Sequence, residues 1–215
     1  GHRPSVVLLL PTGKPPHDPI PAGHLDELNR LLDSDLVFDP APSLSELASG
    51  LNTHTLPDAD INAPSTREAV AALEEDIVLV APPPGAILGR DLLDTGKRFL
   101  HLHPGEIPGW RGSTTFYYSL LAEGALHCSA FEMAPEIDAG PVLHIKRLDD
   151  VALPPIDVDR LVDPGLRTVT MLEWIALDDP GPIPRAGEPD RTFYVMHPLL
   201  RHRAILQRQK THGQV

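Results

Sequence analysis

The chain has 215 residues, of which 41% are hydrophobic, and this share excludes a fully disordered chain. Its 30 acidic and 18 basic residues give a net charge of −12, which argues against a general binder of nucleic-acid backbones or anionic membranes. The single cysteine, Cys128, excludes an internal disulfide framework and favours a reducing, cytoplasmic compartment. We therefore expect one globular domain of moderate size with a short tail.

No run of residues approaches the roughly 20 apolar positions of a membrane helix, so we expect no membrane partner. The 25 prolines predict stiff connections between the elements of a globular core. The chain begins with Gly1-His2 in place of Met, which indicates the remnant of a cleaved purification tag, and His2 is left out of the functional reasoning.

A strand, a helix and a second strand are predicted at the start of the chain. The continuous apolar run over 5–10 predicts a strand buried on both faces of a parallel sheet. Leucines at helical spacing predict a helix over 22–32, and a short apolar run predicts a strand over 36–38. These three elements make one β-α-β unit, which favours parallel pairing.

A capping signal marks the next helix. Ser43 and Glu46 have the Ser-x-x-Glu spacing of a capping box, so we expect Ser43 to cap a short helix over 44–49. Gly50 then supplies a residue at which the helix can end. The following stretch, 52–63, is rich in turn-forming residues and predicts no definite element.

A further helix and strand lead to a loop that suits a ligand. Ser65 is expected to open a helix over 66–75, and the apolar run over 76–80 predicts a buried strand. Pro82-Pro-Pro-Gly85 interrupts the chain directly after that strand. Because open α/β sheets usually bind ligands at the carboxyl ends of their strands, this loop is predicted to face a ligand.

The second half continues the mixture of strands and helices. Its predicted elements are strands over 98–103, 126–133 and 142–148, and helices over 113–122, 168–177 and 199–208. The last two strands alternate polar and apolar residues, as antiparallel strands do. The whole pattern predicts a layered α/β architecture with a mostly parallel central sheet flanked by helices.

Three polar side chains in the middle of the chain are candidates for chemistry. His101 and His103 are two residues apart on a predicted strand, so their side chains are expected on one face and that of Leu102 on the other. Asp138 lies in the tight turn Ile137-Asp-Ala-Gly140. A lone histidine is more often structural than catalytic, but two histidines at a strand end with an acidic turn downstream favour a functional site.

These residues belong to a longer pattern. His101-Leu-His-Pro104 is followed by Ile107-Pro-Gly-Trp-Arg-Gly112 and then by Glu136-Ile-Asp-Ala-Gly-Pro-Val-Leu143, and His103 and Asp138 are 35 positions apart (138 − 103). The composite resembles the motif of the formyltransferases that use 10-formyltetrahydrofolate, a family that includes the glycinamide ribonucleotide, methionyl-tRNA and sugar N-formyltransferases. The resemblance extends over residues 5–148.

The resemblance implies a Rossmann-like formyltransferase fold, with a catalytic domain over 3–150 and a C-terminal extension over 151–215 packed on it. It implies transfer of a formyl group from 10-formyltetrahydrofolate to an amine of a small-molecule acceptor in specialised biosynthesis, without a resident metal. The residues it points to are the catalytic His101, His103 and Asp138, the folate-binding Gly85, Ala86, Ile87, Leu88 and Asp138, and the substrate-binding Arg111 and Gly112.

Two of these assignments have structural alternatives of their own. Arg111 holds a substrate anion in one interpretation and forms a salt bridge within its loop in the other. Gly85 to Leu88 either line the pteridine pocket or form a plain turn between a strand and a helix.

One position departs from the family pattern, because His101 stands where the family has Asn in Asn-x-His. By resemblance, that Asn donates an amide N–H to the oxyanion of formyl transfer, while the Asp orients the His. An imidazole supplies one N–H donor, so His101 is predicted either to replace the amide or to mark altered chemistry.

Other activities and partners remain open from the sequence. His-x-His on one strand with a further Asp or His suits a zinc-dependent hydrolase. The exchange of Asn for His also suits hydrolysis of the formyl donor, another non-formyl reaction, or binding without turnover. The expected partner is a small amine, such as an amino sugar, an amino acid or a ribonucleotide amine, without nucleic acid, and a homodimer is a further expectation.

Three residues near the predicted site are assigned structural roles. Cys128 is expected to be a small core residue, because it lies on an alternating strand. His127 and His144 are expected at solvated strand positions.

Overall fold

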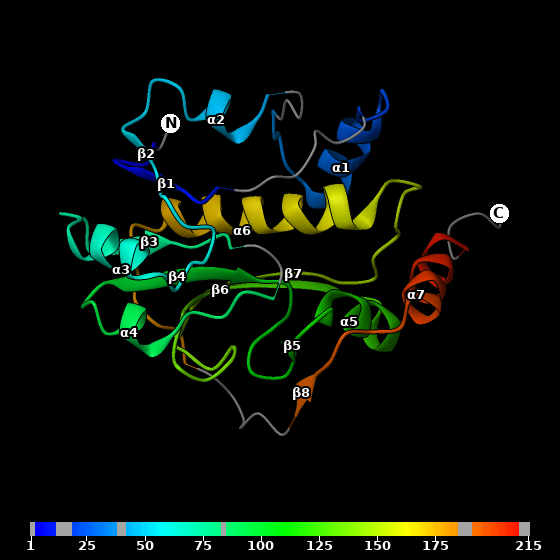
Figure 1. Cartoon of the computed structure of the whole chain (residues 1–215). Coiled ribbons are helices and arrows are strands. Elements are labelled where there is room, and N and C mark those ends of the chain that lie inside the picture. The colour runs from blue at the N-terminus through cyan, green and yellow to red at the C-terminus, as the bar shows by residue number, and fades with distance from the viewer. Residues whose placement is uncertain (1–2, 12–18, 38–41, 83–84, 185–190, 211–215) are drawn as a thin grey trace. The chain divides into compact units, whose positions relative to one another are not determined.

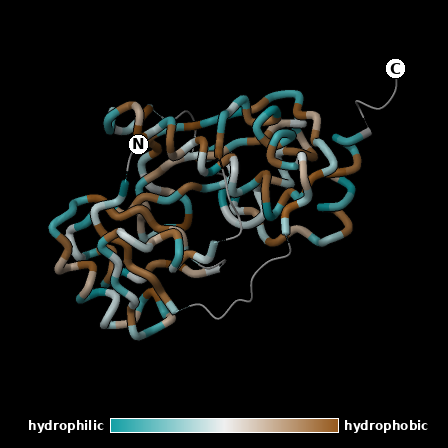
Figure 2. The backbone as a smooth tube through the Cα atoms, turned by 90° about the horizontal axis from the view of Figure 1, so that it is seen from above, coloured by the Kyte–Doolittle hydropathy of each residue, from teal (hydrophilic) through white to brown (hydrophobic). Residues whose placement is uncertain are grey.

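The computed structural model describes residues 3–11, 19–37, 42–82, 85–184 and 191–210 (Figure 1). The chain divides into two compact units: unit 1 comprises Gly1–Pro21 and Val37–Phe99, and unit 2 comprises Ala22–Leu36 and Leu100–Val215. Apolar and polar residues alternate over short distances along the backbone, as the brown and teal segments of Figure 2 show. Each unit is described by itself.

A parallel pair of strands lies in unit 1. β1 (Val7–Leu9) lies beside β2 (Thr53–Thr55), with Val7 opposite Thr53 and Leu9 opposite Thr55. The parallel pairing predicted for the first strand is confirmed, and β2 lies in a stretch that predicted no element. The expectation of burial on both faces is wrong, because the described part of the chain gives β1 one neighbouring strand and its residues are half-buried.

The strand predicted over 36–38 is not observed at the two of its residues that the structure describes. Leu36 and Val37 are in irregular structure, and Phe38 lies outside the described residues. The side chain of Asn29 brackets Leu36 instead: Nδ2 donates to the Leu36 carbonyl (2.9 Å) and Oδ1 accepts from the Leu36 N–H (3.0 Å). Those two bonds use the backbone groups that strand pairing would require.

The capping box forms as predicted. Ser43 Oγ accepts from the Glu46 N–H at 3.2 Å, and Glu46 Oε2 accepts from the Ser43 N–H at 2.7 Å. The helix that they begin, α2 (Leu44–Leu47), is shorter than predicted because it ends before Gly50 is reached.

The third helix, α3 (Pro64–Ala71), starts earlier than predicted. Ala63 precedes it and Pro64 takes its first position, where the missing proline N–H needs no partner. The prediction that Ser65 opens the helix is therefore wrong, and Ser65 Oγ donates to Asp58 Oδ2 at 2.5 Å.

Unit 1 ends with β3 (Ile77–Leu79), α4 (Arg90–Leu93) and the first residues of β4 (Arg98–His103). The Arg98 N–H donates to the Asp76 carbonyl at 2.8 Å. The strand predicted over 76–80 is present, but Ile77 and Leu79 are 37% and 47% exposed, so its predicted burial on both faces is wrong.

Three antiparallel strands make the sheet of unit 2. β4 enters this unit at Leu100 and pairs with β6 (Leu126–Glu132), which pairs in turn with β7 (Val142–Leu148). The strands predicted over these residues are confirmed, as is the antiparallel pairing of the last two. β6 is buried over its first six residues, because it has a strand on each side and packs against α6 (Asp163–Ala176).

The helices of unit 2 are α1 (His24–Leu32), α5 (Thr115–Glu123) and α6, which a π-helical turn, η1 (Val158–Val162), precedes. α1 packs against α6, where a side chain on Gly165 would meet Leu28 and Leu32 at 3.0–3.1 Å. To admit a side chain at Gly165, these two leucine side chains would have to shift by a few tenths of an ångström.

The last strand and the last helix of the chain contact elements from the middle of the sequence. β8 (Thr192–Phe193) pairs in parallel with β5 (Arg111–Gly112), and α7 (Pro198–Lys210) packs on α5 (Figure 1). The segment after residue 150 thus shares a compact unit with β4, β6 and β7. The division into domains at residue 150 stays a prediction.

The α/β class predicted from the sequence is confirmed. β1 pairs in parallel with β2 and β5 with β8, while β4, β6 and β7, around the two histidines, pair antiparallel. Within the described ranges, no helix is both long and apolar enough to span a membrane.

Candidate active site

The two histidines of β4 share one face of the sheet. Phe131 of β6 pairs with His101, and both imidazole rings meet its ring edge-on, at centroid distances of 6.0 Å for His101 and 6.4 Å for His103. The predicted common direction of the two side chains is therefore confirmed. Phe131 packs with Ile107 in the core and so provides a rigid apolar support for both rings.

The Nε2 atom of His103 is held by a backbone carbonyl. It lies 2.7 Å from the Trp110 carbonyl oxygen and 3.3 Å from Thr115 Oγ1. Because a carbonyl only accepts, Nε2 carries the hydrogen and donates it. The Thr115 hydroxyl donates to the Pro104 carbonyl at 2.7 Å and can therefore accept from Nε2. In the neutral ring, Nδ1 is left with its lone pair.

Gly105 makes this arrangement possible. A Cβ at this position would lie 2.5 Å from the Trp110 carbonyl, 2.9 Å from His103 Nε2 and 2.9 Å from Thr115 Oγ1. The Pro104-Gly105 boundary was predicted only as the end of a strand. Its glycine has a further function, since any side chain here would displace the atoms that fix the His103 ring.

Asp138 faces the other nitrogen of His103. Its Oδ2 lies 3.5 Å from His103 Nδ1 and accepts from the Gly112 N–H at 2.8 Å. Asp138 adopts a left-handed backbone conformation (φ 49°), as a tight turn permits for aspartate. The fold thus brings together His103 and Asp138, two residues that the sequence predicted to act together.

Arg111 holds the turn that carries Asp138. Its Nε donates to the Ile137 carbonyl at 2.9 Å, and its Nη2 donates to the same oxygen. The partner of Arg111 in this contact is a carbonyl, so the contact is not the salt bridge of the structural interpretation, and binding of a substrate anion stays a prediction. Arg111 and Gly112, the two residues of β5, were both predicted to bind substrate. In the structure, Arg111 bonds the turn that carries Asp138, and the Gly112 N–H donates to the Asp138 carboxylate.

Burial and charge oppose each other at His103. Burial lowers the pKa of His103, while the Asp138 carboxylate and the bond to the Trp110 carbonyl raise it. The Arg167 cation and the neighbouring His101 lower it further, and the net effect is a lowered pKa. The side chain of His103 is 4% exposed and that of Asp138 is 13% exposed, so the pair meets solvent mainly through Asp138.

The predicted folate loop lies in unit 1 and is held by a residue that the sequence did not point to. Asn62 Nδ2 donates to the Ile87 carbonyl (2.8 Å), and Asn62 Oδ1 accepts from the Gly89 N–H (2.6 Å). Gly85 has a φ of 85°, Ile87 is 58% exposed and Leu88 is buried. An asparagine in a turn-rich stretch gives no sequence signal for a contact 25 residues away.

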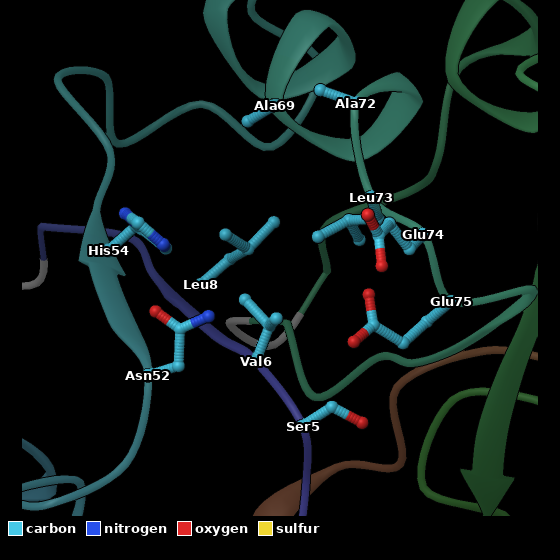
Figure 3. Close-up of a pocket in the computed structure, with 10 residues that line it drawn as sticks. All are labelled: Ser5, Val6, Leu8, Asn52, His54, Ala69, Ala72, Leu73, Glu74 and Glu75. Carbon is cyan, nitrogen blue, oxygen red and sulfur yellow. The ribbon is translucent and has the colours of Figure 1, made fainter.

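Two cavities lie in unit 1. The first, of about 590 Å³, is bounded by β1, β2 and the end of α3 (Figure 3), with Val6 and Leu8 on its floor and Glu74 and Glu75 at one side. It contains none of the predicted site residues. The second, of about 340 Å³, lies beside Gly89 at the end of the predicted folate loop and is also lined by Asn62.

Cys128, His144 and His127 were assigned structural roles from the sequence. Cys128 is buried as predicted, and burial raises the pKa of its thiol to about 12. His144 is half-buried and lies 3.0 Å from Glu173 Oε2. The expected solvation of His127 is wrong: the residue is fully buried, and the Trp110 ring lies 6.5 Å from its own, centroid to centroid.

His127 lies between two carboxylates. Its Nδ1 is 3.6 Å from Glu106 Oε2, and its Nε2 is 3.4 Å from Glu123 Oε2. Arg147 forms ion pairs with both glutamates. Among the residues that the structure describes, no group of three His, Cys, Asp or Glu side chains is arranged to hold a metal ion.

Comparison with known proteins gives relatives of one kind. The chain is 27% identical over 143 residues to methionyl-tRNA formyltransferase of Methylococcus capsulatus, covering 65% of this chain and 44% of that protein. It is 29% identical over 143 residues to the Delftia acidovorans enzyme of the same name, covering 64% and 42%. The match thus spans less than half the length of these curated relatives. No family model matches the chain.

Solved structures show the same fold. Methionyl-tRNA formyltransferase from Clostridium thermocellum aligns with a TM-score of 0.53 at 14% identity, over 90% of this chain and 73% of that one. Phosphoribosylglycinamide formyltransferase from Anaplasma phagocytophilum aligns with a TM-score of 0.51 at 18% identity, over 88% and 97%. The chain is thus similar in sequence to two methionyl-tRNA formyltransferases, and it shares its fold with solved formyltransferases.

Proposed function

We propose that this chain transfers a formyl group from 10-formyltetrahydrofolate to the amine of a small acceptor. The observation that carries the proposal is the contact of His103 with Asp138, two residues of a formyltransferase-like motif that are 35 positions apart in the sequence (138 − 103). Four relatives or structural neighbours named as formyltransferases support it.

In this proposal, Asp138 and His103 handle the proton, and His101 binds the formyl oxygen. Asp138 is the more exposed member of the pair, so its carboxylate takes the proton that the attacking amine gives up. His103 Nδ1, at 3.5 Å, shares that proton, while the Trp110 carbonyl keeps the hydrogen on Nε2. His101 lies on the same face and supplies an imidazole N–H to the formyl oxygen.

The proposed folate site has suitable features in the loop 85–89. The exposed Ile87 side chain offers apolar surface to a flat ring, and nothing lies within 4 Å of the position that a Cβ would take on Gly85. The Asn62 side chain keeps the loop in one conformation by bonding two of its backbone groups. When bound, 10-formyltetrahydrofolate would supply the formyl carbon; its N10–formyl bond would break as the new amide bond forms, and N10 would take the proton held by the His103–Asp138 pair, so that tetrahydrofolate leaves.

The acceptor, compartment and assembly are part of the proposal. A small amine is favoured over tRNA because the chain carries a net charge of −12, which opposes binding to a phosphate backbone. An amino sugar, an amino acid or a ribonucleotide amine in specialised biosynthesis meets this description. A cytoplasmic location is supported by the single, buried Cys128, and a homodimer stays a prediction.

The test is formylation of a panel of such amines with 10-formyltetrahydrofolate, with the formylated product identified by mass spectrometry. Asp138→Asn should lower the rate by about 10²-fold to 10⁴-fold, because it removes the proton acceptor. Asp149→Asn is the matched control, since Asp149 pairs with Arg147 at the surface and should leave the rate unchanged.

Three results would contradict the proposal. Release of formate without any formylated amine would favour hydrolysis of the donor. One zinc ion per chain, after purification without added metal, would favour the zinc hydrolase. An unchanged rate in Asp138→Asn would remove the His103–Asp138 pair from the chemistry.

His101 has a separate test. If His101 only replaces the amide of the family's Asn, His101→Asn should keep or raise the formyl-transfer rate. Loss of turnover in a folded His101→Asn protein would show that the imidazole has a role of its own.

A further inference from the structure

Arg167 of α6 contacts the backbone of β4 between the two histidines. Its Nη1 donates to the Leu102 carbonyl at 2.6 Å. The rest of the guanidinium is fixed by Asp163, one turn earlier on the helix, with Nε at 2.7 Å from Oδ1 and Nη2 at 3.1 Å from Oδ2. This two-bond pairing sets the orientation of the guanidinium plane, so that Nη1 reaches Leu102 in a defined geometry.

We propose that Arg167 is a positioning residue for the His103–Asp138 pair: it anchors β4 through the Leu102 carbonyl and places a permanent positive charge beside the strand that carries His103. Nothing in the predicted motif includes Arg167, which lies 64 residues after His103 (167 − 103). This role deepens the proposed function and rests on it for its effect on turnover.

The charges around His103 support a role in proton transfer. The groups that act on His103 are Asp138, which favours its charged form, and Arg167 and His101, which disfavour it. Arg167 itself faces the carboxylates of Asp163 and Asp138 and the Cys128 thiol. Arg167 is thus the permanent cation in this set, and Asp163 sets how much of its field reaches His103.

A neutral His103 is the form that the proposed chemistry needs. With its hydrogen on Nε2, the neutral ring presents a lone pair at Nδ1 towards Asp138 and can share the proton that arrives there. A permanently charged His103 would have no site for that proton. The Arg167–Asp163 pair therefore adjusts the proton affinity of the centre without touching a substrate.

The experiment is an NMR titration of the His103 ring in the full chain, with its signal assigned by its absence from His103→Gln. Arg167→Gln removes the cation and should raise the apparent pKa of His103 by about 0.5 to 1 pH unit. Asp163→Asn leaves the cation without its neighbour and should lower that pKa. Arg203→Gln, an exposed arginine of α7, is the matched control and should leave it unchanged.

The opposite signs separate this role from a merely structural one. Loss of packing would shift the apparent pKa of His103 in the same direction in both variants, or leave it unchanged in both. Either result would overturn the proposal. If Arg167→Gln does not fold, Arg167→Lys, which keeps the charge, and Asp163→Asn still give the comparison, with Arg167→Lys expected near the wild type. The titration needs no turnover, so it decides the role of Arg167 even if no amine is formylated.

Discussion

At the residue scale, the centre of this protein is a histidine fixed on both sides of its ring. The Trp110 carbonyl determines which nitrogen of His103 carries the hydrogen, and Asp138 faces the other nitrogen. Neither contact requires a charged surface group. The tautomer is set by a backbone carbonyl, so it persists in variants that change the surrounding charges.

Gly105 should be intolerant of substitution. In Gly105→Ala the new Cβ would approach the Trp110 carbonyl to 2.5 Å, so the loop or the His103 ring must move. We expect the free energy of unfolding to fall by about 1–3 kcal/mol, measured by chemical denaturation. Gly109→Ala in the same loop is the control, because its Cβ would meet only the Glu106 carbonyl at 3.8 Å. Equal stability of the two variants would contradict this expectation.

At the element scale, two loops are held by side chains from distant parts of the sequence. Asn62 bonds the loop 85–89 in unit 1, and Arg111 bonds the turn at Ile137 in unit 2. Both side chains bond to backbone groups, so they fix loop conformation whatever side chains the loop carries. A loop held in this way loses less conformational entropy when a ligand binds.

Asn62→Ala should loosen the predicted folate loop. Loss of both bonds frees the Gly89 N–H, whose hydrogen exchange should become faster, and the affinity for tetrahydrofolate should fall by up to about 30-fold, since two bonds of about 1 kcal/mol each are lost. Exchange is measured by mass spectrometry and affinity by calorimetry. The control is Asn52→Ala, because Asn52 lines the other cavity of the same unit. An unchanged affinity with faster exchange at Gly89 would separate this loop from folate binding.

At the scale of the whole molecule, buried histidines link stability to pH. Burial lowers the pKa of His103 and of His127 from the usual 6.5, so the unfolded chain binds protons at a higher pH than the folded chain does. The free energy of unfolding should therefore fall as the pH drops below about 6.5, until the folded pKa values are reached.

His127→Leu should reduce this dependence on pH. The slope of unfolding free energy against pH between about pH 6.5 and pH 5 should decrease, by at most about 1.4 kcal/mol per pH unit, because one proton-binding site is removed. Chemical denaturation over this pH range gives the slope. The exposed His202 of α7 provides the control, His202→Leu, which should keep the wild-type slope. A wild-type slope in His127→Leu would show that His127 titrates alike in both states.

The sequence by itself determined the features that depend on near neighbours in the chain. The Ser43–Glu46 capping box, the strands β4, β6 and β7 and the common direction of His101 and His103 follow from local spacing, and all three are observed. The resemblance of the motif to the formyltransferase pattern also pointed to His103 and Asp138 as a pair. Periodicity is a local property, so it survives whatever the rest of the chain does.

Only the tertiary structure decided which partners the polar side chains take. Arg111 bonds the Ile137 carbonyl, Asn62 bonds a loop 25 residues away, and Arg167 reaches the strand between the two histidines. His127 is buried beside Trp110 of a distant loop, a contact that alternation along its own strand cannot reveal. Backbone carbonyls occur at every residue and carry no sequence signal, so contacts to them become visible only once the chain is folded.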